Sequence, residues 1–333
     1  MPVFIHAAGC TNTCRHCGAE GRPPHGALFS LGEVRAIAHE WGLLVIYFEL
    51  SAHPDFPEIM HPDVNDGEDV LATNGFGLAR CADSDAVFAR LREFGYTGVS
   101  HTLHSIGDNH DWFVARRGAY QDIITSSARV VEAGFELHWN VCLDNRHLAD
   151  APILVEMKER EFGGTISVGI PNHCVNRRMW DYESLRPSER DVATHLTDDF
   201  LAQCEWPKPV GELTEDAWLR AWHDDPKPFE PRYDHDSWPP DDPFTDLSIE
   251  ISADRSIRLA PLGAPKIHLG HLADGRAAIE DRLRALPCPE LTITPDEAAT
   301  VLSGSPLLHT SPLSVRNKVV ATLVHDGAVV DQT

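Results

Sequence analysis

The chain has 333 residues, 42% of them hydrophobic, so it is long enough to bury a large core. Its formal net charge of −23 argues against a nucleic-acid partner, since phosphate binding needs a basic face. The charge favours solubility, and it can also steer a cationic small molecule. The sequence has no apolar run long enough to span a membrane, and its start lacks the features of a signal peptide. We therefore expect a cytoplasmic protein with no membrane partner.

Short apolar segments alternate with amphipathic ones through the first half of the chain. Strands are predicted over residues 3–6, 43–50, 69–75, 97–105, 135–143 and 165–171. Helices are predicted over residues 30–42, 85–95, 119–134 and 151–163. Ser30 and Glu33 have the spacing of a capping box at the start of the first helix. This alternation favours parallel βαβ units and an α/β fold.

Two α/β architectures are compatible with this pattern, a doubly wound open sheet and a full or partial barrel of the TIM type. In both, ligands bind at the carboxyl ends of the strands. The loop that follows the first predicted strand therefore lies on the functional face.

The pattern changes after about residue 185. One helix is predicted over 186–204, and residues 224–246, with seven aspartates and six prolines, are predicted to be an irregular connector. Three further elements are predicted: a β-hairpin over 246–261, a helix over 275–286 and a second hairpin over 318–333 that turns at Asp326-Gly327. We therefore divide the chain into a core, residues 1–185, and a small α+β extension, residues 186–333.

Three of the eight cysteines, Cys10, Cys14 and Cys17, lie close together in the loop after the first predicted strand. The others are scattered, at positions 81, 142, 174, 204 and 288. A zinc site normally takes four ligands in two separated pairs, and a thioredoxin-like site takes two cysteines. Three thiolates suit a [4Fe–4S] cluster with one iron left open for a small ligand.

The spacing Cys10-x3-Cys14-x2-Cys17, directly after the first strand of a βα chain, resembles the motif of the radical S-adenosylmethionine (SAM) superfamily. The resemblance extends over roughly residues 1–180 and implies a partial (β/α)6 barrel of the TIM type. It also implies reductive cleavage of SAM to a 5′-deoxyadenosyl radical, which abstracts hydrogen from a substrate carbon. A flavodoxin or ferredoxin is the kind of electron donor that this chemistry implies.

The same resemblance assigns residues to the binding of SAM. The segment YFELSAHPDFPEIM, residues 47–60, fits the place of the family's Gly-Gly-Glu-Pro motif, of which only Glu49 is kept. In the family this carboxylate helps to hold the SAM amino group. His16, before the third cysteine, stands where the family prefers an aromatic ring near adenine. The remaining expected SAM contacts are Asn74 in TNGFG, Thr102 on the fourth strand, and Arg116 or Arg117 near the SAM carboxylate.

Residues 248–275 resemble the hairpin of a SPASM or twitch domain, which often carries auxiliary clusters. Pro261-Leu262 stands where those domains place cysteines, and Cys288 is the only later cysteine, so we expect an extension without a cluster. This favours a redox-neutral reaction, because a dehydrogenation has to pass an electron onward. Cys142 and Cys174, near the expected mouth of the barrel, are candidate hydrogen donors or else ordinary small buried residues.

The sequence thus predicts a radical SAM enzyme that acts on a small natural-product intermediate, such as a sugar, a nucleoside or an amino-sugar. Epimerisation is the leading reaction. The enzymatic alternatives are radical modification of a ribosomal peptide and dehydrogenation of a small molecule. An alternative of another class is a non-catalytic module that binds a metal or a cluster, although Glu49 and the TNG turn are features that such a module does not need.

Overall fold

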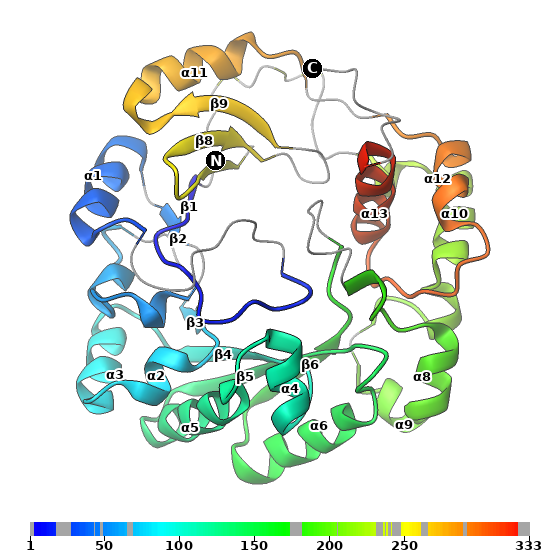
Figure 1. The fold of residues 1–333 in the computed structure, drawn as a ribbon, viewed down its shortest axis with the longest axis horizontal. Coiled ribbons are helices and arrows are strands. Elements are labelled where there is room, and N and C mark those ends of the chain that lie inside the picture. Colours follow the sequence, from blue (N-terminus) through cyan, green and yellow to red (C-terminus); the bar gives the residue numbers. More distant parts are fainter. Residues whose placement is uncertain are drawn as a thin grey trace.

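The structure, a computed structural model, describes residues 3–17, 28–42, 44–46, 49–64, 69–173, 182–204, 206–230, 236, 238, 241, 248–260, 266–288 and 292–325. Within these residues the strands form two sheets, one of four strands and one of five. Figure 1 shows the two sheets on opposite sides of the molecule's centre, with most helices around the outside.

The four-stranded sheet is parallel, in the order β3-β4-β5-β6. Its strands are β3 (Val70–Ala72), β4 (Gly98–Leu103), β5 (Glu136–Cys142) and β6 (Thr165–Gly169). The crossover helices are α3 (Ser84–Glu93), α5 (Ala119–Glu132) and α6 (Asp150–Glu161). Alternate residues of β5 are buried against these helices, and the indole of Trp139 donates to Ser127 Oγ of α5 at 3.0 Å. The residues of β5 between the buried ones are partly buried or exposed and lie on the other face of the sheet.

The five-stranded sheet has the order β2-β1-β7-β8-β9. Its strands are β1 (Val3–Ile5), β2 (Leu44–Ile46), β7 (Ile249–Ile251), β8 (Ser256–Leu259) and β9 (Ile267–His271). Strand β1 is parallel to both β2 and β7, and β8 and β9 continue the sheet in antiparallel pairs. The C-terminal strands therefore extend the sheet that contains the first strand.

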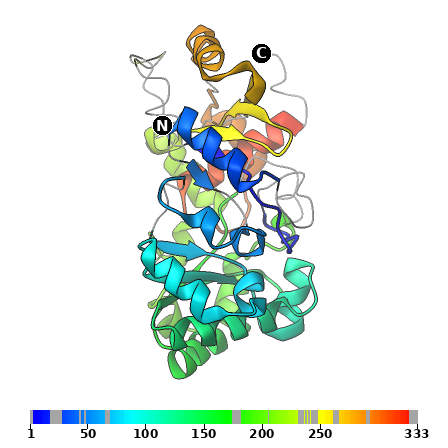
Figure 2. The ribbon, with the colours of Figure 1, turned by 90° about the vertical axis from the view of Figure 1, so that its left-hand side faces the viewer.

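The C-terminal elements also contact the first helix. Helices α1 (Leu31–Trp41) and α11 (Arg276–Ala285) lie beside the five-stranded sheet, and Figure 2 shows α11 at the end of the molecule far from α5. Arg255 pairs with Glu33 of α1 at 2.9 Å, and the Arg276 amide donates to Glu40 at 2.9 Å. The remaining side of the ring holds α8 (Glu189–His195), α9 (Asp198–Leu201), α10 (Glu215–Asp224), α12 (Pro295–Leu302) and α13 (Pro312–His325).

Most of the predicted periodic elements are confirmed. All six strands and four helices of the first half are present, and the α/β fold is a partial barrel. No strand pairing closes the gap between β2 and β3 in the part of the chain that the structure describes. Ser30 and Glu33 make the capping box at the start of α1. The 246–261 hairpin and the 275–286 helix are also found, whereas the domain division at residue 185 stays a prediction.

The single helix predicted over 186–204 is wrong. Leu196 has an extended backbone, with φ −116° and ψ 140°, which ends α8. The Thr197 side chain then accepts the Phe200 amide and begins α9 as a new N-cap. The capping potential of a threonine in the middle of a helical pattern explains the break.

The hairpin predicted over 318–333 is also wrong, because α13 occupies residues up to His325. Its valines favour a strand by propensity, but Val315 and Val319 are fully buried one helical turn apart. Packing of this face therefore overrides the local preference. The expected turn at Asp326-Gly327 lies outside the described residues. None of the described helices is long and apolar enough to cross a bilayer.

Gly77, in the short helix α2 (Phe76–Arg80), offers a test of the packing between α2 and the segment around Ser51. A Cβ at Gly77 would lie 1.7 Å from the Ser51 carbonyl oxygen, so we expect Gly77→Ala to lower the free energy of unfolding by about 3 kcal/mol or more. Gly32→Ala is the matched control, because a Cβ there meets only Ser30 Oγ, at 4.0 Å. Thermal and urea unfolding of both variants measures the difference, and equal stability would contradict the close contact at Ser51.

Candidate functional site

The loop that follows β1 carries the cysteine motif. Cys10 is buried, Cys14 and Cys17 are partly buried, and all three thiols are free of disulfides. The Cys17 amide donates to the Cys14 carbonyl oxygen at 3.1 Å, which makes a turn around His16. The loop starts at the carboxyl end of its strand, and Figure 1 shows it running through the centre of the ring. Its position agrees with the functional face predicted from the βα pattern.

A helix that the sequence did not indicate supports this loop. The amides of Thr13 and Arg15 donate to the carbonyl oxygens of Val114, at 2.8 Å, and Phe113, at 3.2 Å. These acceptors form the last turn of α4 (Gly107–Val114), where carbonyl groups lack partners within the helix. The end of α4 therefore fixes the backbone between Cys10 and Cys17.

Arg116 ties the same loop to α5. Its Nε donates to Asn12 Oδ1 at 2.6 Å, and its guanidinium also pairs with Asp122. Arg117, the other candidate for the SAM carboxylate, is exposed in the turn before α5. The structure thus brings Arg116, but not Arg117, into contact with the cysteine loop, and the role of either toward SAM stays a prediction.

Glu49 lies just beyond β2, fully enclosed, with 3% of its surface exposed. Its Oε1 accepts the hydroxyls of Ser51 and Thr73, and its Oε2 accepts the Asn74 amide at 2.5 Å. Burial raises the pKa of Glu49, whereas these hydrogen bonds favour the ionised form. Both oxygens bind the chain itself, and the predicted contact with the SAM amino group stays a prediction.

Asn74 links the end of β3 to the motif. Its side-chain amide donates to Thr11 Oγ1 at 2.9 Å and to Cys10 Sγ at 3.5 Å. Asn74 is followed by Gly75 at φ 80°, a left-handed conformation that glycine adopts without strain. The TNG turn therefore presents an amide donor to a motif sulfur.

His16 lies in a group of rings. Its ring centroid is 4.7 Å from that of His104 and 5.6 Å from that of Phe113. His104 stacks on Phe113 at 3.8 Å. Burial, with smaller contributions from nearby His16 and His110, holds the pKa of His104 well below its usual range, so this imidazole is neutral at pH 7. The expected contact of His16 with adenine stays a prediction.

Polar side chains line the face of the four-stranded sheet that is turned away from its helices. This inward polar row consists of Ser100, Thr102, His138, Asn140, Cys142 and Ser167, all partly buried. Asn140 joins three strands, since its amide donates to Ser100 at 2.8 Å and its carbonyl oxygen accepts the Ser167 hydroxyl at 2.6 Å. Thr102 lies opposite Asn140 in the register. The row faces the cysteine loop, because Asn74, two residues beyond the inward Ala72, reaches Cys10.

Comparison with known proteins identifies this arrangement. Residues 4–145 match the family model of the radical SAM superfamily. This part of the chain is a radical SAM domain. The domain's cofactors are the [4Fe–4S] cluster and SAM that this family uses.

The fold of the chain is similar to solved structures described as anSMEcpe with bound AdoMet. The native form has 11% sequence identity and a TM-score of 0.51, with 98% of each chain covered. The His6-tagged form has 10% identity and a TM-score of 0.50, with 99% of this chain and 98% of that chain covered. At these identities the likeness concerns the fold alone. No curated protein sequence matches the chain.

The donor chemistry of the loop fits the cluster of a radical SAM domain. Three soft thiolates on one short loop suit iron, and the Asn74 amide beside Cys10 Sγ suits a negatively charged sulfur. The thiols of Cys81 and Cys204 instead donate to the carbonyl oxygens of Leu78, at 3.3 Å, and Phe200, at 3.6 Å. The thiols of Cys81 and Cys204 are therefore bonded to α2 and α9 and not to the cysteine loop.

Of the two candidate hydrogen donors, the structure describes one. Cys142 is the last residue of β5 and lies on the inward polar row, opposite Gly169 of β6. Burial raises the pKa of the Cys142 thiol to about 12, so it remains S–H at neutral pH. Cys174 lies outside the described residues.

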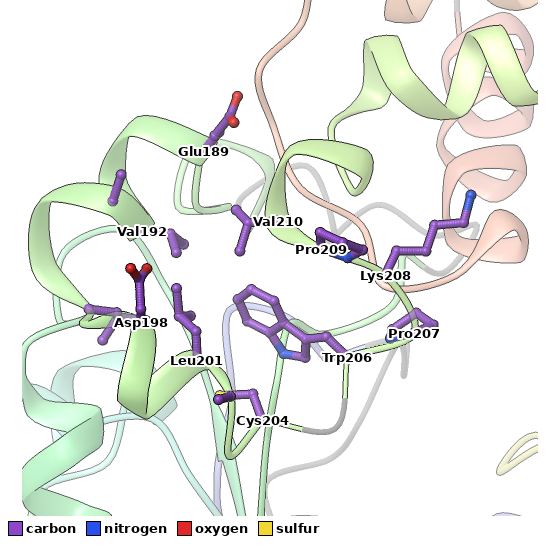
Figure 3. Close-up of a pocket in the computed structure, with 13 residues that line it drawn as sticks. Glu189, Val192, Asp198, Leu201, Cys204, Trp206, Pro207, Lys208, Pro209 and Val210 are labelled. Atoms are coloured by element: carbon purple, nitrogen blue, oxygen red, sulfur yellow. The ribbon is translucent and has the colours of Figure 1, made fainter.

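A surface pocket is lined by residues other than those of the cysteine loop and the inward polar row. It has a volume of about 670 Å3 and lies between α8, α9, Cys204 and residues 206–210 (Figure 3). The indole of Trp206 projects into it, and its Nε1 donates to the Val168 carbonyl oxygen at 3.3 Å. This tryptophan covers the outer edge of β6. We therefore interpret the pocket as a result of the packing of Trp206 on that strand.

A buried charge cluster joins the segment between β6 and α8 to α10 and α13. It consists of Glu183, Arg186, Glu215, His309 and Lys318. Ligand atoms of Glu183, Glu215 and His309 lie within 4.8 Å of one another, a spacing that can hold a metal. However, the Lys318 ammonium lies 3.0 Å from Glu183 and 2.5 Å from Glu215 and already supplies the positive charge. We therefore interpret the cluster as structural.

Sequence reasoning missed several residues of the site. The supporting groups Asn12 and Ser51 carry no motif signal, and Thr73 belongs to the TNG turn without a role that the motif assigns. Their roles depend on contacts between distant segments. Ser100, His138 and Asn140 of the inward polar row follow the alternation of polar residues along β4 and β5, and His104 continues it just beyond β4. That alternation was visible in the sequence, and it is the signal that could have found them.

Lys318→Met tests the structural role of the buried charge cluster. We expect it to lower the free energy of unfolding at pH 7 by about 3–5 kcal/mol, because it leaves Glu215 buried without its ammonium partner. Burial raises the pKa of Glu215, but the hydrogen bond with His309 and the charge of Lys318 outweigh this effect and hold the pKa below its usual range. In the variant this pKa rises, so the deficit should narrow as the pH falls toward 4.5.

The matched control for this measurement is Lys227→Met, which removes an exposed lysine of the short helical turn Lys227–Phe229. Urea unfolding at both pH values compares the two variants. An equally small change in the free energy of unfolding for both variants would show that Lys318 does not stabilise the buried charge cluster.

Proposed function

We propose that Cys10, Cys14 and Cys17 hold the [4Fe–4S] cluster, and that the enzyme removes a hydrogen atom from a polar small molecule and returns one to the same carbon. The leading reaction is epimerisation of a sugar, a nucleoside or an amino-sugar. The observation that carries the proposal is the inward polar row, which faces the cysteine loop and ends in the thiol of Cys142.

The chain's own residues supply placement and a hydrogen donor. When bound, the cluster and SAM supply a radical that is reactive enough to break a C–H bond. The end of α4 and Arg116 fix the loop that holds the cofactors, and Glu49 fixes the TNG turn beside it. A rigid site limits side reactions, because the substrate carbon is presented in one orientation.

The inward polar row supports a substrate rich in hydroxyl or amine groups. Ser100, Asn140 and Ser167 have hydroxyl and amide groups that can each make more than one hydrogen bond. Such groups discriminate strongly, since an analogue without the matching hydroxyl leaves a buried polar group unpaired. A hydroxyl-bearing ring therefore suits this face better than an apolar molecule does.

Cys142 is the proposed donor of the returned hydrogen. Its raised pKa keeps the hydrogen on sulfur, and atom transfer to the substrate radical forms the new C–H bond as the S–H bond breaks. The cysteine is left as a thiyl radical, which one electron and one proton from an external donor return to the thiol. A flavodoxin or ferredoxin is the proposed source of electrons. Cys174 remains a second proposed donor.

Anaerobic reconstitution with iron and sulfide tests the cluster assignment. We expect about four irons per chain, with formation of 5′-deoxyadenosine from SAM in the presence of dithionite. Cys14→Ala should lose the iron and the formation of 5′-deoxyadenosine. Cys204→Ala should keep both, because the Cys204 thiol donates to the Phe200 carbonyl oxygen of α9. One zinc per chain without 5′-deoxyadenosine would favour a non-catalytic metal-binding module, and about eight irons would show an auxiliary cluster.

Solvent deuterium tests the hydrogen donor. Sugars, nucleosides and amino-sugars are screened in deuterated water for those that increase 5′-deoxyadenosine formation. With such a substrate, we expect one deuterium at one inverted carbon, because a thiol exchanges with solvent. Cys142→Ala should still form 5′-deoxyadenosine but lose inversion by at least about tenfold, a barrier increase of about 1.4 kcal/mol.

Cys204→Ala is again the matched control, since it removes a thiol from outside the inward polar row. Full inversion in Cys142→Ala, with loss only in Cys174→Ala, would reassign the donor. An oxidised product without deuterium would favour dehydrogenation.

A further inference from the structure

The amide of Asn74 is directed at a sulfur that the proposed function assigns to the cluster. We propose that Asn74 raises the reduction potential of the cluster by donating a hydrogen bond to Cys10 Sγ. This inference rests on the proposed function for one point only, that Cys10 is a cluster ligand. It gives Asn74 a role that does not require contact with SAM.

The geometry fixes which end of the side chain meets the sulfur. Asn74 Oδ1 accepts the Phe76 amide at 3.1 Å, an acceptor role that only the oxygen can fill. The nitrogen therefore points the other way, toward Cys10 Sγ at 3.5 Å and Thr11 Oγ1 at 2.9 Å. The two hydrogens of one NH2 group can serve both acceptors.

The surroundings hold the donor in place. The Asn74 backbone amide is bonded to the buried Glu49 carboxylate, and the Gly75 amide donates to Thr73 Oγ1 at 3.1 Å. A Cβ at Gly75 would lie 3.1 Å from the Asp122 carbonyl oxygen, so α5 packs tightly on this turn. Cys10 itself is 8% exposed, which keeps water from replacing the amide as donor.

The effect on the cluster follows from charge. A cluster that gains an electron places more negative charge on its sulfurs, and an N–H donor stabilises the reduced state more than the oxidised state. Hydrogen bonds to sulfur are one of the factors that set the potentials of iron–sulfur clusters. In a buried site such a bond is electrostatically stronger than in water. Removal of the donor should therefore lower the potential and make the cluster harder to reduce.

The test is a potentiometric measurement on the full-length reconstituted protein without SAM. The electron paramagnetic resonance signal of the reduced cluster reports the midpoint potential. Asn74→Ala removes the donor, and Asn74→Asp keeps an acceptor for the Phe76 amide but places a carboxylate oxygen near the sulfur. We expect a lower potential in Asn74→Ala and a still lower one in Asn74→Asp.

The matched control is Asn109→Ala, which removes an asparagine of α4 whose amide donates to Asp150 instead. Its potential should equal that of the unmodified protein. Iron content and thermal unfolding of each variant show whether the cluster and the fold are retained, and the two Asn74 variants provide independent routes if one of them unfolds.

The outcomes separate this inference from the proposed function. An unmodified protein that binds no iron would remove the cluster assignment itself. Four irons, together with an unchanged potential in both Asn74 variants, would overturn the tuning role and leave the cluster assignment intact. Weaker SAM binding at unchanged potential would assign Asn74 to SAM instead, which also overturns the inference.

Discussion

The buried carboxylate of Glu49 joins the two sheets at the point where strand pairing does not. Glu49 follows β2, at one edge of the five-stranded sheet, and Thr73 and Asn74 follow β3, at one edge of the other. A carboxylate is costly to bury, and the hydrogen bonds from both sides compensate for that cost only when the two edges stay together. The Glu49 side chain thus links the two sheets at the open seam of the partial barrel, and that seam lies beside the cysteine loop.

The C-terminal third contributes to the same arrangement, although the resemblance suggested an appended extension. Strand β7 pairs in parallel with β1, so the strand that leads into the cysteine loop has a partner on each side. On the opposite side of the ring, Lys318 of α13 neutralises Glu183 and Glu215. These contacts bring C-terminal elements into the ring around the loop, so this part of the chain shares its packing with the first half.

The sequence predicted the parts of the molecule whose signals are local. The period of the apolar residues gave the strands and helices of the first half, and the Ser30–Glu33 pair gave the start of α1. The cysteine spacing gave the radical SAM domain. The predictions were wrong or missing where tertiary contacts determine the secondary structure. Valines of α13 form a helix because they pack as a helical face, and α4, with Gly107, Asp108 and Asn109 in its first turn, has weak propensity. Asn74 was expected near SAM, and only the folded chain shows its amide beside Cys10.

Glu49 and Asn74 have different roles in the site. Glu49 positions the TNG turn, and Asn74 contacts the Cys10 sulfur. Glu49 binds backbone and hydroxyl groups and sets where the TNG turn lies, so its replacement would move the seam, the loop and the amide donor together. Asn74 contributes its side chain to Cys10 only after that position is set. A change in cluster potential on substitution of Asn74, with the fold retained, would therefore reflect a local electronic interaction. The same change on substitution of Glu49 could not be assigned, because the position of every donor in the turn depends on its carboxylate.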